Sequence, residues 1–528
     1  MTRAWTPAQR TILWTFVLMA LLAVRLPSLV EPAGGDQGLY EYVGQRINAG
    51  DVTYRDAWDQ KPPAIHVIYA LLWRVWPGDA IAAAADLIAA GIVAGLLVLL
   101  GRRTFGTGVG AGAACVFLIF GNPAIQRLSG VRVRGQCETF IALAVTAALV
   151  IAAHPARQRW RFALAGVWLG AAFWLKYNAG VYVIPLAFVA AGTRRSADRR
   201  SNIAWIGAGF LAVAAIVVGY FAAHGALEAL RLATIDYNLQ YSRETYQGFS
   251  GALSYLTFPV ERAAADALWF FGGAGCLLLL ITSWRDRNTW LTLSWIAAAC
   301  ASIAVNGARD LPQYFVQAHP ALALTAAAGF APILRSDTPR LLRLAMALLI
   351  LAGLWRVGSE PRVLRLGGLP GVVENMRFDL DYARGRMDRA TYLARFQQQS
   401  DAKFVPRSAD ELETYVRRAT RESDTILVFG FAGGVYAHTG RASASRFFWS
   451  RPVEVEFGVP RPGYGSPGLL ADLERNRPAI VALQKHWGKG AEDPISFFMN
   501  HADLSSWLRR DYVLDEDTPE FAVWRRTP

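Results

Sequence analysis

Residues 31–72 read EPAGGDQGLYEYVGQRINAGDVTYRDAWDQKPPAIHVIYALL, and this stretch decides how the rest of the chain is interpreted. It carries four aspartates, a lysine and a Pro-Pro pair directly behind an apolar run, residues 12–30, that is long enough to cross a membrane. That run is longer than the core of a typical signal peptide and lacks a convincing small-residue cleavage site. We therefore expect a retained helix, with cleavage as the weaker alternative. The charged stretch is then expected to lie at the membrane surface.

The composition places the chain among membrane proteins. Of its 528 residues, 53% are hydrophobic and only 18% are charged, and 18 are tryptophan. The net charge of +13 is expected to come from basic cytoplasmic loops, since no basic stripe interleaved with aromatics indicates nucleic-acid binding. The four cysteines fall within or at the edge of apolar segments, which predicts neither a disulfide scaffold nor a cysteine-based metal site.

Apolar runs predict about eleven transmembrane helices, the pattern of a polytopic α-helical membrane protein. The segment 64–76 is apolar but carries His66 and Arg74, and if it crossed the bilayer the basic loop 101–106 would lie outside. We therefore predict an amphipathic helix at the outer interface there. The expected spans are 12–30, 80–101, 107–121, 137–154, 161–175, 177–192, 203–223, 264–282, 290–305, 314–334 and 341–356. The loops expected to face the cytoplasm are 101–106, 154–161, 193–200, 283–288 and 335–340.

The carboxy-terminal part, residues 357–528, is a different kind of sequence, charged and polar. Its strand-like runs TILVFGF and AIVALQ are separated by helical patterns such as SADELETYVRRAT, which predicts a small α/β domain. The expected division is a transmembrane domain over 1–356, with a catalytic outer loop over 31–79, and an extracytoplasmic soluble domain over 357–528. The run VFGFAGGVYAHTGRASASRFFW suits either binding of an acceptor or donor headgroup or a cover that only stabilises the membrane part.

The first outer loop offers a general base. A carboxylate at headgroup depth needs only hydrogen-bond reach and partial desolvation to deprotonate a sugar or lipid hydroxyl. Asp36 follows Gly34 and Gly35, whose flexible backbone permits close approach to a ligand. Any one acid of this loop, taken alone, is better explained as keeping the loop solvated. The arrangement around Asp36 favours the functional interpretation.

Basic residues of the outer loops suit a phosphate. Lys61 precedes Pro62-Pro63 at the start of the predicted interfacial helix, and its alternative role is a snorkelling anchor. The outer loop 122–136 is basic against the positive-inside trend. Its arginines suit a phosphate or pyrophosphate about as well as a structural pairing with loop acids, and Lys176 raises the same question. These arginines are Arg127, Arg132 and Arg134.

A later outer stretch, NGARDLPQYFVQAHPALAL, places Arg309, Tyr314 and His319 at the outer end of a predicted span. Such groups can orient a polar headgroup. A lone histidine at this depth is more often a packing residue than a metal ligand, so we assign no metal site. No cofactor is firmly implied. A divalent metal stays an alternative, but no clear cluster of ligands supports it.

Together these motifs resemble the lipid-linked-sugar glycosyltransferases of the GT-C fold, in the group with protein O-mannosyltransferases and the lipid A aminoarabinose transferase (glycosyltransferase family 39). The resemblance covers roughly the first 360 residues. It rests on GDQGLYEYVGQRINAGD followed by DQKPPAIHVIYALL, on GRRTFG, on LGAAFWLKYNAGVYVIPLA and on RDLPQYFVQAHPALAL. It implies that Asp36 is the catalytic carboxylate and that Lys61 contacts the phosphate of a polyprenyl-phosphate sugar donor. The family usually has Asp-Glu where this chain has Asp36-Gln37, which leaves Glu41 or Asp59 as substitutes for the second acid.

The expected activity is therefore inverting transfer of a hexosyl or pentosyl group from a polyprenyl-phosphate donor to an acceptor hydroxyl on the outer face of a bacterial-type cytoplasmic membrane. The acceptor is a lipid, a glycan or a protein, and no nucleic acid is expected. Expected donor-binding residues are Lys61, Arg132, Arg134, Lys176 and Arg309. Expected substrate contacts are Tyr40, Glu41, Asp59, Tyr314 and His319.

The rival function is a transporter or lipid flippase. Transporters place ionisable groups and broken helices near the membrane midplane, whereas the acids of this chain cluster at one face. A non-catalytic scaffold is the second rival, and it predicts that Asp36→Asn and Lys61→Ala leave function intact.

Overall fold

The computed structural model describes residues 6–126, 133–155, 158–192, 196–245, 250–305, 311–359, 368–396, 405–486 and 492–527. The chain divides into two compact units. The first, called here the helical unit, comprises Met1–Leu29, Ala83–Val218 and Ser242–Leu380. The second, called here the mixed unit, comprises Val30–Ala82, Gly219–Tyr241 and Asp381–Pro528, so the first predicted outer loop and most of the carboxy-terminal part share one unit.

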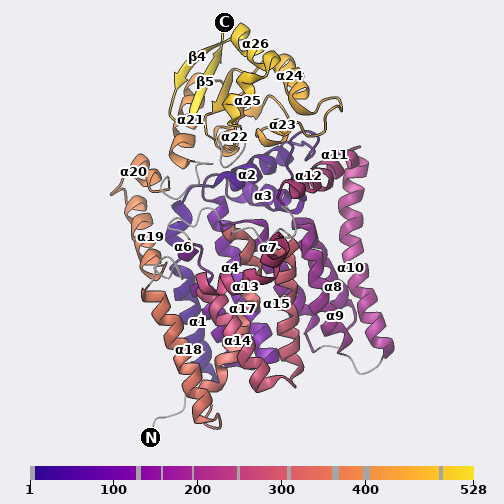
Figure 1. The fold of residues 1–528 in the computed structure, drawn as a ribbon, viewed down its shortest axis with the longest axis vertical. Helices are drawn as coiled ribbons and strands as arrows, with labels where there is room; N and C mark the ends of the chain where they lie inside the picture. Colours follow the sequence, from indigo (N-terminus) through magenta and orange to yellow (C-terminus); the bar gives the residue numbers. More distant parts are fainter. Residues whose placement is uncertain are drawn as a thin grey trace. The chain divides into compact units, whose positions relative to one another are not determined.

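The helical unit consists of apolar helices, and each of the eleven runs predicted to span is helical over most of its length (Figure 1). Its main helices are α1 Pro7–Ala23, α4 Ile81–Thr104, α5 Thr107–Phe120, α7 Cys137–Ala152, α8 Trp160–Leu175, α9 Val183–Ala191, α10 Ser196–Ala223, α13 Ser250–Ala265, α14 Ala267–Ser283, α15 Arg287–Val305, α17 His319–Phe330, α18 Arg340–Ser359 and α19 Gly368–Ala383. Among the described residues, four segments are long and apolar enough to cross a membrane: Thr11–Val30, Ile81–Thr104, Ala197–Ala223 and Arg287–Val305. The number of crossings stays a prediction.

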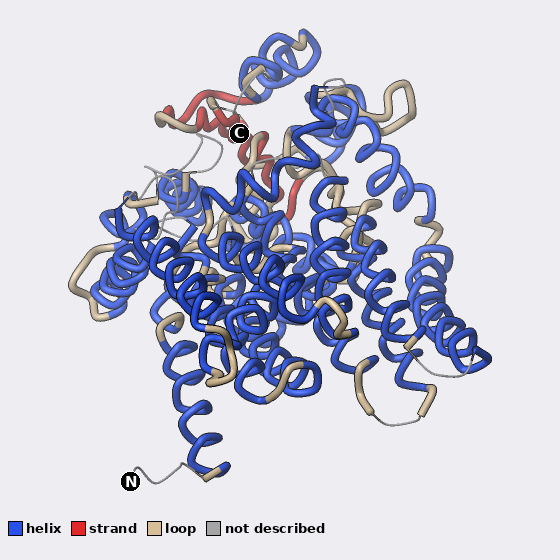
Figure 2. The backbone as a smooth tube through the Cα atoms, turned by 60° about the horizontal axis from the view of Figure 1, so that its bottom comes forward, coloured by secondary structure: helices blue, strands red, loops and turns tan. Residues whose placement is uncertain are grey.

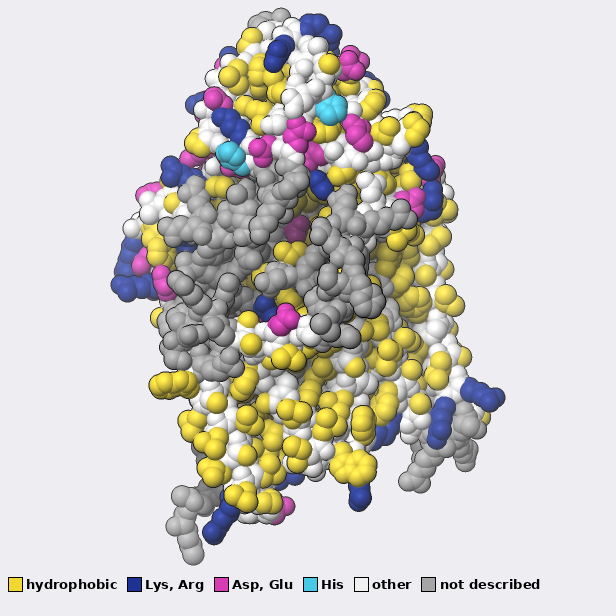
Figure 3. Space-filling model, in the orientation of Figure 1, with side chains coloured by type: hydrophobic (Ala, Val, Ile, Leu, Met, Phe, Trp, Pro, Cys, Tyr) yellow, Lys and Arg dark blue, Asp and Glu magenta, His cyan; other side chains and the backbone are white. Residues whose placement is uncertain are grey.

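Large apolar side chains on the outer helices face outward. Leu211 and Ile216 of α10 are 64% and 71% exposed, and Leu341 and Trp355 of α18 are 82% and 75% exposed. Figure 3 shows hydrophobic side chains spread over the surface of the long helices. In water such a continuous apolar surface is unfavourable, whereas lipid tails cover it without loss. The predicted multi-pass membrane protein is therefore confirmed.

Several of the predicted spans are broken rather than continuous. In the run 12–30, α1 ends at Ala23 and a 3₁₀ helix, Leu26–Val30, follows. The run 177–192 begins as a 3₁₀ helix, Tyr177–Tyr182, before α9. The run 314–334 consists of the end of α16 Pro312–Phe315, a 3₁₀ turn Val316–Ala318, the helix α17 and a second 3₁₀ turn Ala331–Leu334. Proline stands in the first turn of three of these pieces, where its missing N–H leaves no helical bond unmade.

The mixed unit contains a five-stranded sheet, which confirms the predicted α/β tail (Figure 2). Strand order is β2-β1-β3-β5-β4, with β1 Thr425–Phe429 and β3 Ile480–Gln484 parallel and β5 Phe521–Arg526 antiparallel to β3. β1 and β3 are the two predicted strands, and all of their residues except the first of β1 are buried. The remaining strands are β2 Ala442–Ser443 and β4 Tyr512–Asp517.

Helices from both ends of the chain complete the mixed unit. The first predicted outer loop supplies α2 Gly35–Asn48 and α3 Ala64–Val75, so a helix forms where an interfacial helix was predicted. The middle segment supplies α11 Leu227–Arg231, a π-helix Leu232–Asp236 and the start of α12 Tyr237–Thr245. The tail supplies α20 Arg389–Ala394, α21 Pro406–Ala419, α22 Gly434–Thr439, α23 Arg451–Glu454, α24 Gly465–Asn476, α25 Pro494–Asn500 and α26 Ala502–Asp511. The domain division at residues 356 and 357 stays a prediction.

Candidate active site

Asp36 lies in the first turn of α2. The helix begins after Gly34, which has extended backbone and offers no side-chain cap, so the first turn presents main-chain N–H groups and the positive end of the helix dipole to this carboxylate. Asp36 is partly exposed, whereas all eight residues from Gln37 to Gly44 are buried. Asp36 is thus a partly exposed acid at the start of a helix whose next eight residues are buried.

Lys61 lies two residues before Pro63, the N-cap of α3, and is partly exposed. Its main-chain carbonyl accepts a 2.7 Å hydrogen bond from the hydroxyl of Tyr54, and the carbonyl of Gln60 accepts a 2.8 Å bond from the amide of Asn238. Tyr54 is fully buried and has φ +71°, a left-handed conformation that a bulky residue rarely adopts. Backbone strain of this kind persists only where the surroundings enforce it, so the loop before Lys61 is held in one shape.

Asp59 and His66 form a buried pair across the Pro-Pro turn. Nε2 of His66 lies 2.7 Å from Oδ2 of Asp59, and both side chains are at most 1% exposed. Oδ1 of Asp59 also accepts a hydrogen bond from the N–H of Gln60. Asp59 therefore braces the turn that carries Lys61, and its predicted contact with substrate stays a prediction.

Tyr40 is part of the same packed region. Its ring makes edge-to-face contacts with His66 and Tyr69, with centroids 6.0 and 5.5 Å away, and the residue is 1% exposed. The Tyr40 ring therefore packs α2 against α3. Its predicted contact with substrate stays a prediction.

Glu41 is fully buried and meets His438 of α22. Oε2 of Glu41 lies 2.9 Å from Nε2 of His438, whose Nδ1 lies 2.8 Å from Oε1 of Glu413 on α21. Burial raises the pKa of Glu41 to about 7, although its hydrogen bond to His438 opposes the rise. Burial alone would lower the pKa of His438, but the charge of Glu413 and the hydrogen bonds to both glutamates outweigh it and hold that pKa well above its usual value. The imidazolium is thus the stable form between the two acids.

Lys176 and Tyr314 come together in the helical unit. The Lys176 ammonium pairs with Glu138 in the first turn of α7 and lies 4.2 Å from the centre of the Tyr314 ring. Lys176 is 9% exposed and Glu138 is 1% exposed. Of the alternatives for Lys176, the structure therefore shows a buried pairing with an acid, and its role toward phosphate stays a prediction.

Of the other residues predicted in the helical unit, Arg134 and His319 are described, and both are buried. Arg134 is buried and donates to the carbonyl of Ser28 at 3.4 Å, in a region where Arg25 pairs with Asp86, also at 3.4 Å. His319 is buried at the start of α17. Arg127, Arg132 and Arg309 lie outside the described residues.

Sequence reasoning missed four side chains that organise this site: Tyr54, His66, His438 and Glu413. His438 stood within the quoted run VFGFAGGVYAHTGRASASRFFW, and the chain has only 7 histidines. A histidine directly after the apolar run Val435–Ala437 was the available signal, but its acidic partner on α2 lies 397 positions away.

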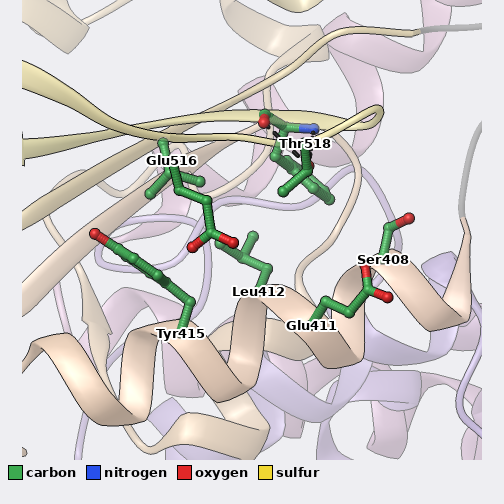
Figure 4. A pocket seen from close by; sticks show the side chains of 8 residues that line it. Ser408, Glu411, Leu412, Tyr415, Glu516 and Thr518 are labelled. Atoms are coloured by element: carbon green, nitrogen blue, oxygen red, sulfur yellow. Dashed lines mark hydrogen bonds between the residues drawn. The ribbon is translucent and has the colours of Figure 1, made fainter. Parts of the chain in front are cut away.

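Two further observations bear on the chemistry. The described residues contain no group of three or more His, Cys, Asp or Glu side chains that could hold a metal ion. A hollow lies between α21 and the β4–β5 hairpin (Figure 4). It presents Glu411 and Glu516, which would repel a phosphate, and it includes none of the predicted site residues. The hollow is lined by Ser408, Glu411, Leu412, Tyr415, Glu516, Thr518, Phe521 and Val523.

Comparison with known proteins gives one family match and several structural ones. The model of the dolichyl-phosphate-mannose-protein mannosyltransferase family matches residues 60–221. No curated protein matches the chain in sequence. ArnT from Cupriavidus metallidurans bound to undecaprenyl phosphate superposes with a TM-score of 0.60 at 15% identity, covering 98% of each chain. ArnT in the apo state gives 0.58 at 13% identity and the same coverage.

A third solved structure is the arabinofuranosyltransferase AftD from Mycobacteria. It superposes with a TM-score of 0.50 at 11% identity and covers 97% of this chain but 41% of its own length. At these identities the likeness concerns the fold. Because it extends over nearly the whole chain, it includes both the apolar helices and the carboxy-terminal sheet.

Proposed function

We propose, from the premise that the chain has the GT-C fold of membrane glycosyltransferases predicted by its motifs, that it transfers a sugar from a polyprenyl-phosphate donor to an acceptor hydroxyl. The transfer takes place on the outer face of the cytoplasmic membrane, with inversion at the anomeric carbon. Asp36 is the general base and Lys61 binds the donor phosphate. The acceptor is a lipid, a glycan or a protein.

The observation that carries this proposal is the position of Asp36. It is a partly exposed carboxylate at the amino end of α2, in the same compact unit as the partly exposed Lys61. The chain shares its fold over 98% of its length with ArnT, a protein solved with undecaprenyl phosphate bound. This likeness supports a lipid-phosphate donor. A polyprenyl carrier keeps the donor in the bilayer and presents its phosphate at the outer surface, where nucleotide sugars are absent.

The reaction is a single displacement. The acceptor oxygen attacks the anomeric carbon from the face opposite the phosphate, the bond from that carbon to the phosphate oxygen breaks, and polyprenyl phosphate leaves with the bonding electron pair. Asp36 takes the proton of the attacking hydroxyl. Lys61 stabilises the charge that develops on the leaving phosphate. Attack from the opposite face produces inversion.

The remaining predicted residues have secondary roles in this proposal. Arg134 and Lys176 supply positive charge to the donor phosphate, as do Arg132 and Arg309 outside the described residues. Tyr314 and His319 orient the donor headgroup. Tyr40, Glu41 and Asp59 contribute to the substrate site from α2 and from the turn before α3.

The test is transfer by the purified full chain in detergent, supplied with a panel of undecaprenyl-phosphate sugars and candidate lipid, glycan and peptide acceptors. The product is followed together with release of undecaprenyl phosphate, which a transporter or flippase does not generate. Asp36→Asn is expected to abolish transfer. Asp51→Asn is the matched control, because Asp51 lies in the same loop and its carboxylate is paired with Arg46 at 2.6 Å. Transfer that survives Asp36→Asn would contradict the assignment of Asp36 as the general base.

A further inference from the structure

His438 joins three segments that are far apart in the sequence. Its Nε2 faces Oε2 of Glu41 on α2 at 2.9 Å and Oδ1 of Asp79, just before α4, at 3.4 Å. Its Nδ1 faces Oε1 of Glu413 on α21 at 2.8 Å. A protonated imidazole has one N–H on each nitrogen and no acceptor, so this ring is directed entirely at carboxylates.

Burial makes the link strong. The Glu41 side chain is fully buried, and those of His438 and Glu413 are 10% and 7% exposed. A buried carboxylate is destabilising unless a cation and hydrogen bonds compensate it, and here one imidazolium serves both glutamates. Arg417 closes the far end, since it donates to the carbonyl of His438 at 2.8 Å and contacts Glu413 at 3.5 Å.

Glycine contacts bring the two helices together beside this link. A Cβ placed on Gly38 of α2 would lie 2.6 Å from the main-chain nitrogen of Gly434 in α22, so the helices approach this closely because Gly38 has no side chain. A Cβ on Gly35 would overlap the ring of Phe431. Gly35 and Gly38 flank Asp36 in the sequence, so the tail packs on both sides of that residue along the helix.

We infer that His438 is a positioning residue, which clamps α2 to the α/β tail through Glu41 and Glu413 and so fixes the orientation of Asp36. Glu41 lies five residues after Asp36, about one and a half turns further along the same short helix, so a rotation of α2 that the clamp prevents would displace the Asp36 carboxylate. The inference rests on the proposed function. It gives the tail run that contains His438 a role in turnover, beyond that of a cover that only stabilises the membrane part.

The clamp is tested on the full chain with His438→Gln, which keeps a hydrogen-bonding side chain but removes the cation. Two quantities are measured: kcat and KM for the undecaprenyl-phosphate sugar that the wild type uses, and amide hydrogen exchange over α2. We expect kcat to fall by about 10- to 100-fold with little change in donor KM, because misplacement of a catalytic group slows the chemical step. We also expect faster exchange in α2, with α24 as the unchanged reference helix.

Three further variants make the result decisive. His501→Gln is the matched control, since His501 also faces a carboxylate, Glu456 at 3.4 Å, and it lies between α25 and α26 rather than in α22. Glu413→Gln weakens the same clamp from the other side and decides the question if His438→Gln fails to fold. Wild-type kcat in the folded His438→Gln and Glu413→Gln variants, with or without faster exchange in α2, overturns the inference. Turnover that survives Asp36→Asn instead overturns the proposed function, while the exchange data, which need no activity, still show whether His438 holds α2.

Discussion

The hydroxyl of Tyr54 donates a 2.7 Å hydrogen bond to the main-chain carbonyl of Lys61, and Tyr54 adopts a left-handed backbone conformation while it does so. The two residues are seven positions apart, so this bond closes the loop that contains Trp58 and Asp59. Trp58 is tied to the tail in turn, because its main-chain N–H donates to the carbonyl of Arg446 at 2.9 Å. The loop before Lys61 is therefore fixed by its own hydrogen bond and by one from the carboxy-terminal part.

Tyr54→Phe is expected to lower turnover several-fold and stability by about 1 kcal/mol, since it removes one buried hydrogen bond and leaves the Lys61 carbonyl without that donor. Steady-state kinetics and thermal unfolding in detergent check both effects. Tyr512→Phe is the matched control, because the Tyr512 hydroxyl donates to the carbonyl of Pro478 at the same 2.7 Å within the tail. An equal loss of turnover in both variants would contradict a specific role for the loop.

Gly38→Ala is expected to push α2 away from α22. The new methyl would meet the main chain of Gly434 rather than a flexible side chain, and overpacking of this kind costs about 1–3 kcal/mol. We expect a lower unfolding temperature and a loss of transfer activity. Gly95→Ala in α4 is the control, because nothing lies within 4 Å of its Cβ position, and alanine should be neutral or slightly stabilising there. Full activity in Gly38→Ala would show that the close contact between the two helices does not matter for turnover.

The stability of the protein is expected to fall as pH rises from 5 to 8. Burial raises the pKa of Glu41 from 4.5 to about 7, so its contribution to stability is complete below pH 4.5 and is lost as pH rises through 7. His438 acts with the same sign, since its pKa is also raised and its contribution is lost at still higher pH.

Glu41→Gln should flatten this dependence, because the amide cannot ionise. The check is the unfolding temperature of wild type and variant at several pH values between 5 and 8. Glu228→Gln is the control, with a side chain 71% exposed. Parallel curves for wild type and Glu41→Gln would contradict the assignment of the pH dependence to this carboxylate.

The parts of the molecule that the sequence predicted are those specified by local patterns. Apolar runs marked the helices, and the alternation of TILVF and IVALQ with polar segments marked β1 and β3. Strand β4, VLDED after Tyr512, reads as a polar loop, because it is an edge strand with exposed side chains and only its pairing with β5 makes it a strand.

The candidate site was predicted only in part for a related reason. Asp36 and Lys61 stand in one short segment with recognisable glycine and proline neighbours, so their local geometry could be anticipated. The partners of Glu41 and Lys176 could not, because His438 and Glu138 are brought to them by tertiary packing and no spacing rule connects them. The partner of Asp59 could not be predicted either, since only the fold shows that it faces His66.

Lys61→Ala is expected to reduce turnover by about two orders of magnitude, equivalent to about 3 kcal/mol of transition-state stabilisation. If Lys61 were only a snorkelling anchor, its loss would loosen the loop instead. The structure argues against that outcome, because the main chain on either side is held by Tyr54 and Asn238, and both hydrogen bonds survive the change. Lys61→Arg separates the two roles further: it keeps the charge but replaces a point charge by a planar fork, so we expect partial activity.

Lys485→Ala is the control for loss of a paired lysine, since Lys485 contacts Asp517 at 2.6 Å in the tail. A Lys61→Ala variant with wild-type kcat and a lowered unfolding temperature would identify Lys61 as an anchor and remove it from the donor site.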